Sequence, residues 1–156
     1  MKVLTLTQPW ATLVAIGAKK IETRSWSTSY RGPLAIHAAK GLASVGGVSG
    51  LYDLCETEPF HTALRGQDLP HVLPKCSIVA VCELVAIEDT DWVIKNHGAY
   101  KIIGGGRRHW PLIDQERAFG DYSPGRYAWL LLNIRALPEP VPCKGQLGLW
   151  EYEGEL

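Results

Sequence analysis

The sequence predicts a mainly β domain that also contains helices (the α+β class), built as a small β-barrel with helices packed across its openings. Strand patterns are spread along the whole chain, and the two longest cover residues 78–87 and 127–135. One clear helix pattern stands near the start, where apolar residues recur at helical spacing over residues 10–17. A doubly wound parallel sheet is excluded because it needs a helix between successive strands, and that alternation is missing.

The first third of the chain begins with a short strand over residues 3–5. Pro9 then marks a helix start, since the first turn tolerates a residue without an N–H group, and Gly17 marks the helix end. Residues 19–26 are too short for a second helix, so we predict a strand with alternate residues on opposite faces. A turn at residues 30–32 leads into another strand.

The rest of the chain is dominated by the two long strands. A weak helix pattern, interrupted by a proline, covers residues 51–64. Residues 78–87 carry apolar and β-branched side chains on both faces, which predicts a central strand buried on both sides. A short helix is predicted around Trp92, and Gly104-Gly105-Gly106 predicts flexible backbone. After the second long strand, a proline-rich segment cannot donate regularly to a ladder.

The length of 156 residues fits one domain over residues 1–156. With 46% hydrophobic and 21% charged residues, the composition excludes wholesale disorder. The net charge is zero, so steering toward long anionic polymers is weak. Residues 1–50, however, carry six basic and one acidic side chain, whereas residues 51–100 carry three basic and eight acidic ones. The sequence therefore allows a local anion-binding face in the N-terminal third.

The sequence also leads to expectations about the location of the protein and about metal and cofactor sites. No apolar run approaches the ~20 residues that span a bilayer, and the N-terminus lacks a secretory signal pattern, so we expect a cytoplasmic protein. The four cysteines contain no C-x-x-C pair, which disfavours a structural zinc site. A P-loop signature is also missing. We predict no metal and no cofactor, and we expect the cysteines to be small buried side chains.

Lys19, Glu22, Arg24 and Trp26 form the densest polar and aromatic cluster, at the junction between the first helix and the following strand. Lysine offers a point charge and arginine a planar fork, and both suit phosphate groups. Glu22 is suited to hydrogen-bond a base edge or to orient the two cations, and a tryptophan stacks on bases. The alternative is an exposed strand face that carries an ordinary ladder of ion pairs.

The cluster belongs to a longer pattern that resembles the ASCH domain family. The family motif, G-x-K-x-x-E-x-R, is matched by Gly17, Lys19, Glu22 and Arg24. Further segments are similar to the branch that includes the ASCH domain of a eukaryotic transcriptional coactivator, namely residues 6–11, 30–40, 125–129 and 145–150. The resemblance therefore covers nearly the whole chain.

The resemblance implies a PUA-like β-barrel with a basic cleft beside the motif, which binds RNA, another nucleic acid or a nucleotide-like ligand. Some small family members are amidohydrolases that act on acetylated cytidine, and ribonuclease activity is known in the family. If this chain is such a hydrolase, Lys19 and Glu22 are the catalytic candidates. The amidohydrolase branch, however, has a catalytic threonine at the position of Glu22, and Thr23 points to the opposite strand face. This departure argues against amidohydrolase activity.

Four further residues are candidate ligand contacts. Gln8 lies at the start of the first helix, where backbone N–H groups favour anions, and we expect its amide to read a polar edge of the ligand. His37 lies near a strand end and is either a cleft residue or a packed, hydrogen-bonded histidine. Arg107 and Arg108 follow the three glycines and suit a loop that grips a nucleic-acid backbone; the alternative is an ordinary surface loop.

Overall fold

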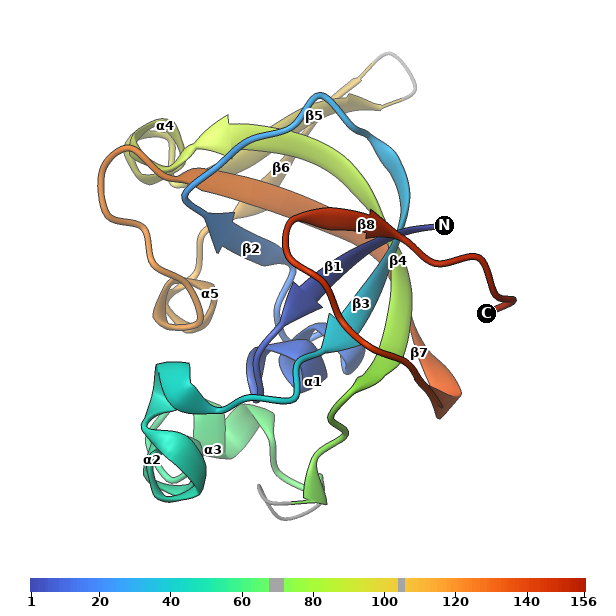
Figure 1. The fold of residues 1–156 in the computed structure, drawn as a ribbon. Coiled ribbons are helices and arrows are strands. Elements are labelled where there is room, and N and C mark those ends of the chain that lie inside the picture. Colours follow the sequence, from blue (N-terminus) through green and yellow to red (C-terminus); the bar gives the residue numbers. More distant parts are fainter. Residues whose placement is uncertain (68–71, 104–105) are drawn as a thin grey trace. The chain divides into compact units, whose positions relative to one another are not determined.

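The computed structural model describes residues 1–67, 72–103 and 106–156. Six strands form one sheet, and Figure 1 shows that two of them are much longer than the others. The sheet order is β2 (Ile21–Arg24), β7 (Tyr127–Pro142), β4 (Ser77–Asp89), β3 (Gly32–Ala38), β1 (Lys2–Leu6) and β8 (Leu149–Glu151). Two further strands, β5 (Gly98–Ile103) and β6 (Gly106–Pro111), pair with each other.

The helices of the described residues are short. They are α1 (Trp10–Ala15), the 3-10 helix η1 (Ala43–Val45), α2 (Gly47–Cys55), α3 (Phe60–Ala63), α4 (Thr90–Lys95) and α5 (Asp114–Ala118). None of the helices in this part of the chain is long and apolar enough to cross a membrane.

The chain divides into two compact units. Unit 1 contains residues 1–18, 33–82 and 133–156, and unit 2 contains residues 19–32 and 83–132. The long strands β4 and β7 contribute residues to both units. Each unit has its own buried apolar cluster, and the two are described separately below.

Unit 1 is organised around β1. This strand pairs in parallel with β3, where Val3 lies opposite Ala35, and antiparallel with β8, where Val3 lies opposite Trp150. These three residues and Ile78 form a buried cluster. Helix α1 follows β1 and buries its central residues, Ala11 to Val14, as the helical spacing of its apolar residues predicts.

Unit 2 places β2 beside β7. The two strands run antiparallel, with Ile21 opposite Leu130 and Arg24 opposite Tyr127. Ile21 and Leu130 pack in a buried cluster with Val93 from α4. Because β2 is only four residues long and both of its faces are covered, its side chains have closely defined surroundings.

The structure confirms the predicted class of a mainly β protein with helices. The predicted strands at 78–87 and 127–135 lie within β4 and β7, which are neighbours in one sheet. The weak helix pattern at 51–64 is also confirmed as two helices, α2 and α3, on either side of Pro59.

Two segments differ from their predictions. The proline-rich residues 138–142, expected to follow the second long strand, form the end of β7. Residues 98–103 and 106–111 form a hairpin, so the flexible backbone predicted at 104–106 is wrong for Gly106, which pairs with Ile103. Gly104 and Gly105 lie outside the described residues. The basic residues and glycines hide the alternation of these strands in the sequence, because a strand signal depends on apolar residues at every second position.

Candidate nucleic-acid interface

The central feature of the candidate site is a buried lysine that precedes β2. The Lys19 side chain is 0% exposed. Its Nζ donates hydrogen bonds to the backbone oxygens of Ile21, at 2.5 Å, and Phe119, at 3.0 Å, and lies 3.4 Å from Oε2 of Glu22. An ammonium withdrawn from water needs such partners, because burial of an unpaired charge is very costly. Its three donors are therefore directed inward, which differs from the exposed strand face that the sequence allows as the alternative.

Glu116, on α5, holds the backbone in place where β2 begins. Its carboxylate oxygens accept hydrogen bonds from the N–H groups of Lys20 and Ile21, each at 2.9 Å. Burial raises the pKa of Glu116, and the Lys19 charge and these two N–H groups oppose that shift. Nearby, the pKa of Tyr122 is raised, first by burial and then by the charges of Glu116 and Glu22. The start of β2 therefore lies among several ionisable side chains of unit 2, namely Lys19, Glu22, Glu116 and Tyr122.

Glu22 links the buried lysine to a more accessible arginine. Its Oε2 faces Lys19, whereas its Oε1 lies 3.5 Å from Nε of Arg24. The side chains of Glu22 and Arg24 are 10% and 26% exposed. The three motif residues thus form an ion-pair chain that starts in the interior and ends at the partly exposed Arg24. This arrangement differs from a solvated surface ladder, because one end of the chain is fully buried.

Trp26 follows the end of β2 and is half-buried. Its ring packs edge-to-face against Trp129, with ring centroids 4.7 Å apart at an interplanar angle of 83°. The indole N–H of Trp129 also donates a hydrogen bond to the Trp26 backbone oxygen, at 3.4 Å. These contacts hold the Trp26 ring in one orientation while leaving part of it accessible.

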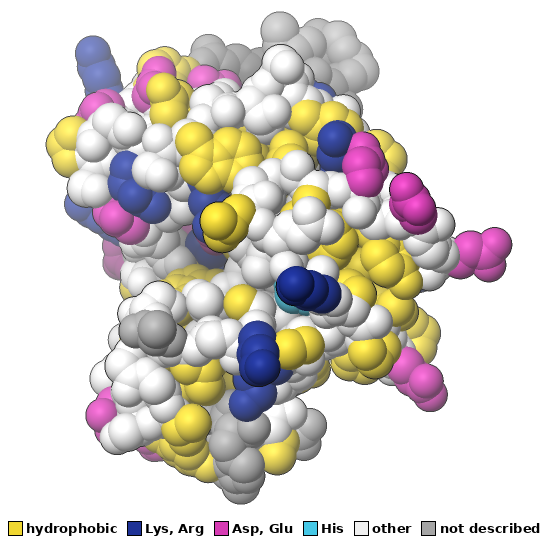
Figure 2. All heavy atoms as spheres, viewed as in Figure 1, with side chains coloured by type: hydrophobic (Ala, Val, Ile, Leu, Met, Phe, Trp, Pro, Cys, Tyr) yellow, Lys and Arg dark blue, Asp and Glu magenta, His cyan; other side chains and the backbone are white. Residues whose placement is uncertain are grey.

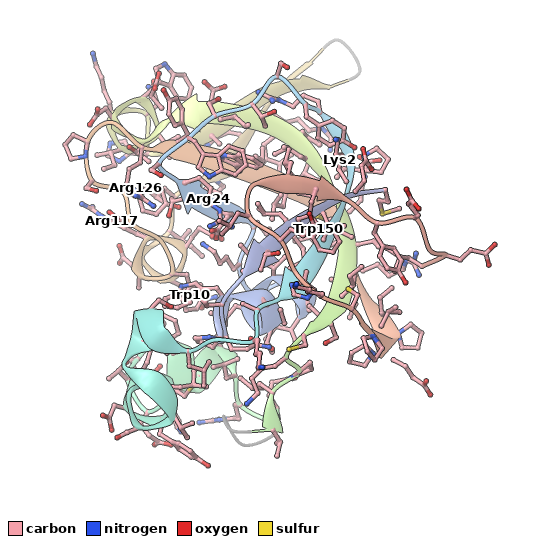
Figure 3. The ribbon with its side chains drawn as sticks, in the orientation of Figure 1. Lys2, Trp10, Arg24, Arg117, Arg126 and Trp150 are labelled. Carbon is pink, nitrogen blue, oxygen red and sulfur yellow. The ribbon has the colours of Figure 1, made fainter. Side chains whose placement is uncertain are left out.

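Two arginines that the sequence analysis missed lie in the same unit. Figure 3 shows Arg117 and Arg126 on the same side of unit 2 as Arg24. Arg117 is exposed, and Arg126 pairs with Asp121 at 3.3 Å and donates to the backbone oxygen of Thr23 at 3.4 Å. Each is the single basic residue of its segment, so no cluster of charges in the sequence indicates a site there. The pairing of β2 with β7 and the position of α5 bring them to this side.

Gln8 has a structural environment in unit 1. It is 0% exposed, its Nε2 donates to the Pro74 backbone oxygen at 2.7 Å, and its Oε1 accepts from the Thr12 N–H at 3.1 Å. The amide therefore ties α1 to the segment before β4. A role in reading the polar edge of a ligand, which the sequence predicts, does not fit this burial.

His37, on β3 of unit 1, is 1% exposed. Its Nε2 lies 3.1 Å from the Cys143 backbone oxygen, and its ring packs edge-to-face on Trp150 with centroids 5.7 Å apart. Burial lowers the pKa of His37, although the hydrogen bond to Cys143 opposes the shift. Of the two environments that the sequence allows, the packed, hydrogen-bonded one is observed, and the ring also borders a pocket.

Arg107 and Arg108 lie on β6, opposite Ile102 and Lys101 of β5. The Arg108 side chain is exposed, whereas that of Arg107 lies outside the described residues. The predicted gripping loop is therefore a strand at these two positions. Among the described residues, no group of three or more His, Cys, Asp or Glu side chains is arranged to hold a metal ion.

Comparison with known proteins extends these observations. The model of one protein family, described as "ASCH domain", matches residues 4–140, which include parts of both units. The chain is 24% identical over 155 residues to Activating signal cointegrator 1 of Mus musculus and 26% identical to the protein of that name from Homo sapiens. In both comparisons 98% of this chain is covered, but it spans only 22% of the length of these relatives.

Two solved structures of ZmASCH from Zymomonas mobilis, each of a different mutant protein, are also similar. The first has a TM-score of 0.48 and 16% identity, over 90% of this chain and 72% of that one. The second has a TM-score of 0.47 and 17% identity, over 90% of this chain and 74% of that one. The family match and the six-stranded sheet with its short helices agree with the PUA-like β-barrel class predicted from the sequence.

Proposed function

Since this chain belongs to the ASCH domain family, we propose that it binds RNA or another nucleic acid through Arg24, the last residue of the family motif, and Trp26, two positions after it. The family is generally linked to RNA binding. The observation that carries the proposal is the ion-pair chain that starts at the buried Lys19 and ends at the partly exposed Arg24. The ion-pair chain thus places the Arg24 cation two residues before the partly accessible ring of Trp26.

The proposed roles follow the exposure of each side chain. Arg24 contacts a phosphate, because its planar fork suits two phosphate oxygens and its side chain reaches solvent. Trp26 stacks on a base, a contact that tolerates any base because every base has a π-face. Lys19 and Glu22 are positioning residues, since Lys19 orients the Glu22 carboxylate and Glu22 in turn orients Arg24.

Arg117, Arg126 and Arg108 are proposed to extend the binding surface of unit 2. Arg117 and Arg108 are exposed, and Arg126 is partly exposed beside Asp121. With zero net charge, the chain is suited to a short single-stranded segment and not to tight binding of long duplexes, where several phosphates must be neutralised. We also propose that both units form one ASCH domain over residues 1–156, because a single family match includes parts of both.

The proposal is tested by fluorescence anisotropy with a short, labelled single-stranded RNA. Arg24→Gln is compared with Arg65→Gln, which removes the same charge from an exposed arginine in unit 1. We expect Arg24→Gln to weaken binding about tenfold, which corresponds to about 1.4 kcal/mol, and Arg65→Gln to have little effect. Trp26→Ala should also weaken binding, whereas Trp26→Phe should retain most of the affinity. Equal affinity of the two arginine variants would refute the proposed site.

A further inference from the structure

The second half of β7, residues 133–142 in unit 1, has one open edge. Strand β2 pairs only with the start of β7, from Tyr127 to Leu130, although β7 continues to Pro142. In the sheet order, β4 is the neighbour on the other side of β7. Among the described residues, no strand is therefore hydrogen-bonded along the second edge of residues 133–142. Such an edge normally presents unpaired N–H and C=O groups with which a strand of another chain can pair.

A backbone hydrogen bond shows which residues of this segment face the open edge. The N–H of Cys143, directly after β7, donates to the oxygen of Cys76, directly before β4, at 2.9 Å. Along a strand, the backbone groups of successive residues point to opposite edges. Positions 139 and 141 therefore face β4, as the N–H of Cys143 does. Positions 138, 140 and 142 face the open edge.

Proline occupies all three of these outward positions, and Pro138, Pro140 and Pro142 are exposed. Because proline has no N–H group, the open edge offers acceptors but no backbone donor between positions 138 and 142. On the other face of the strand, Leu137 and Val141 pack against the buried apolar cluster of unit 1. The prolines repeat with the period of two that a strand has, so the segment keeps its pairing with β4 and its core contacts.

The charges of this edge do not keep two copies apart. Residues 133–142 contain one basic side chain, Arg135, and one acidic side chain, Glu139, and both are exposed. An antiparallel pair of two such edges, centred on residue 137, would place Arg135 of each copy opposite Glu139 of the other copy. Opposite charges at facing positions stabilise a strand pair. Figure 2 shows apolar side chains, a class that includes proline, and an acidic side chain at the surface around the end of β7.

We infer that Pro138, Pro140 and Pro142 keep the open edge of β7 from pairing with the same edge of a second copy of the chain. A ladder between two such edges needs outward N–H groups from both copies, and the prolines remove them from both copies at once. The side chains of the segment would otherwise favour this pairing. The inference concerns unit 1 and does not depend on nucleic-acid binding by Arg24, which lies in unit 2.

The experiment compares the self-association of the full chain and of Pro138→Thr/Pro140→Thr by sedimentation velocity over a range of protein concentrations. Threonine restores the N–H group, favours strands and remains polar. We expect the association constant to rise about tenfold or more, because each copy gains two outward donors. Adding Pro142→Thr should raise it further. The matched control, Pro33→Thr/Pro124→Thr, changes two exposed prolines outside this segment and should associate as the unmodified chain does.

Amide hydrogen exchange locates the contact between the copies. In a dilute sample, the restored amides at positions 138 and 140 should exchange freely, because they face solvent. In a concentrated sample, their exchange should slow by about tenfold or more, because they donate to carbonyl oxygens of the second copy. The single variant Pro140→Thr makes the same test with the smallest change to the fold. Denaturation midpoints equal to that of the unmodified chain establish that the variants are folded.

The inference is overturned if Pro138→Thr/Pro140→Thr and Pro140→Thr associate no more strongly than the unmodified chain. It is also overturned if they associate while the restored amides stay unprotected, since the contact then lies elsewhere. RNA binding by the dilute variants should match that of the unmodified chain, so a failure of this inference and a failure of the site at Arg24 are distinguishable.

Discussion

Nζ of Lys19 lies 3.4 Å from Oε2 of Glu22, and the lysine side chain is fully withdrawn from solvent. This pair gives the family motif a structural role in unit 2. The lysine anchors the glutamate, and the other carboxylate oxygen of the glutamate faces Arg24. The motif residues therefore have different roles: Lys19 and Glu22 hold Arg24 in place.

Loss of the buried lysine should destabilise the protein. In Lys19→Met the backbone oxygens of Ile21 and Phe119 lose their donor, and Glu22 loses its buried partner. We expect the free energy of unfolding to fall by about 3–5 kcal/mol, the cost of breaking a buried ion pair. Chemical denaturation measures this change. Lys20→Met is the control, because that side chain is exposed, and an equal effect of both variants would show that Lys19 has no special role.

The carboxylate of Glu116 should be required as an acceptor of two bonds. In Glu116→Gln the amide oxygen can accept from only one of the Lys20 and Ile21 N–H groups, and the amide NH₂ opposes the other. We expect a loss of about 1–3 kcal/mol in the free energy of unfolding. Glu139→Gln makes the same change at an exposed position and should be neutral. Matching denaturation curves for both variants would contradict this interpretation of the α5 contact.

His37 should make stability depend on pH below its ordinary pKa of 6.5. Burial lowers the folded-state pKa, so the fold favours the neutral ring, and this stabilisation is present above the unfolded pKa and lost as pH falls through the folded pKa. Over that window the difference in unfolding free energy between wild type and His37→Gln should shrink, by at most about 1.4 kcal/mol per pH unit. Denaturation at several pH values measures it, and parallel curves would rule out the assignment.

Hydrolysis of acetylated cytidine is not expected. The position of the amidohydrolase threonine holds Glu22, whose two carboxylate oxygens face Lys19 and Arg24. Thr23 is buried, and its hydroxyl accepts the Asp121 N–H at 2.9 Å. Product formation by the purified protein is the measurement. Turnover that disappears in both Lys19→Ala and Glu22→Ala would establish the enzyme that this reasoning argues against.

The sequence predicts the long strands and the motif cluster for clear physical reasons. Continuous apolar and β-branched runs identify β4 and the first part of β7, because such runs favour buried strands. The spacing of Lys19, Glu22 and Arg24 indicates that the three side chains interact, and the structure shows that they do. Both signals come from residues that are close together in the sequence, so they can be recognised in a single sequence.

The sequence could not predict the degree of burial at the site. Whether Lys19 is exposed depends on the Phe119 oxygen, which lies 100 residues further along the chain. The contact of Glu116 with the start of β2 is equally distant, since it joins residues 96 positions apart. The contact of His37 with the Cys143 oxygen likewise joins residues 106 positions apart. These features follow from tertiary packing, which the hydrophobic periodicity of the sequence does not indicate.

The salt dependence of RNA binding tests the central claim most directly. The logarithm of the association constant for a short single-stranded RNA is measured against the logarithm of salt concentration, for wild type, Arg24→Gln and Arg65→Gln. If Arg24 neutralises a phosphate, Arg24→Gln should weaken binding and flatten the slope by about 0.7, whereas Arg65→Gln should leave the slope unchanged. If Arg24→Gln changes neither the affinity nor the slope, the ion-pair chain beside β2 is not a nucleic-acid interface.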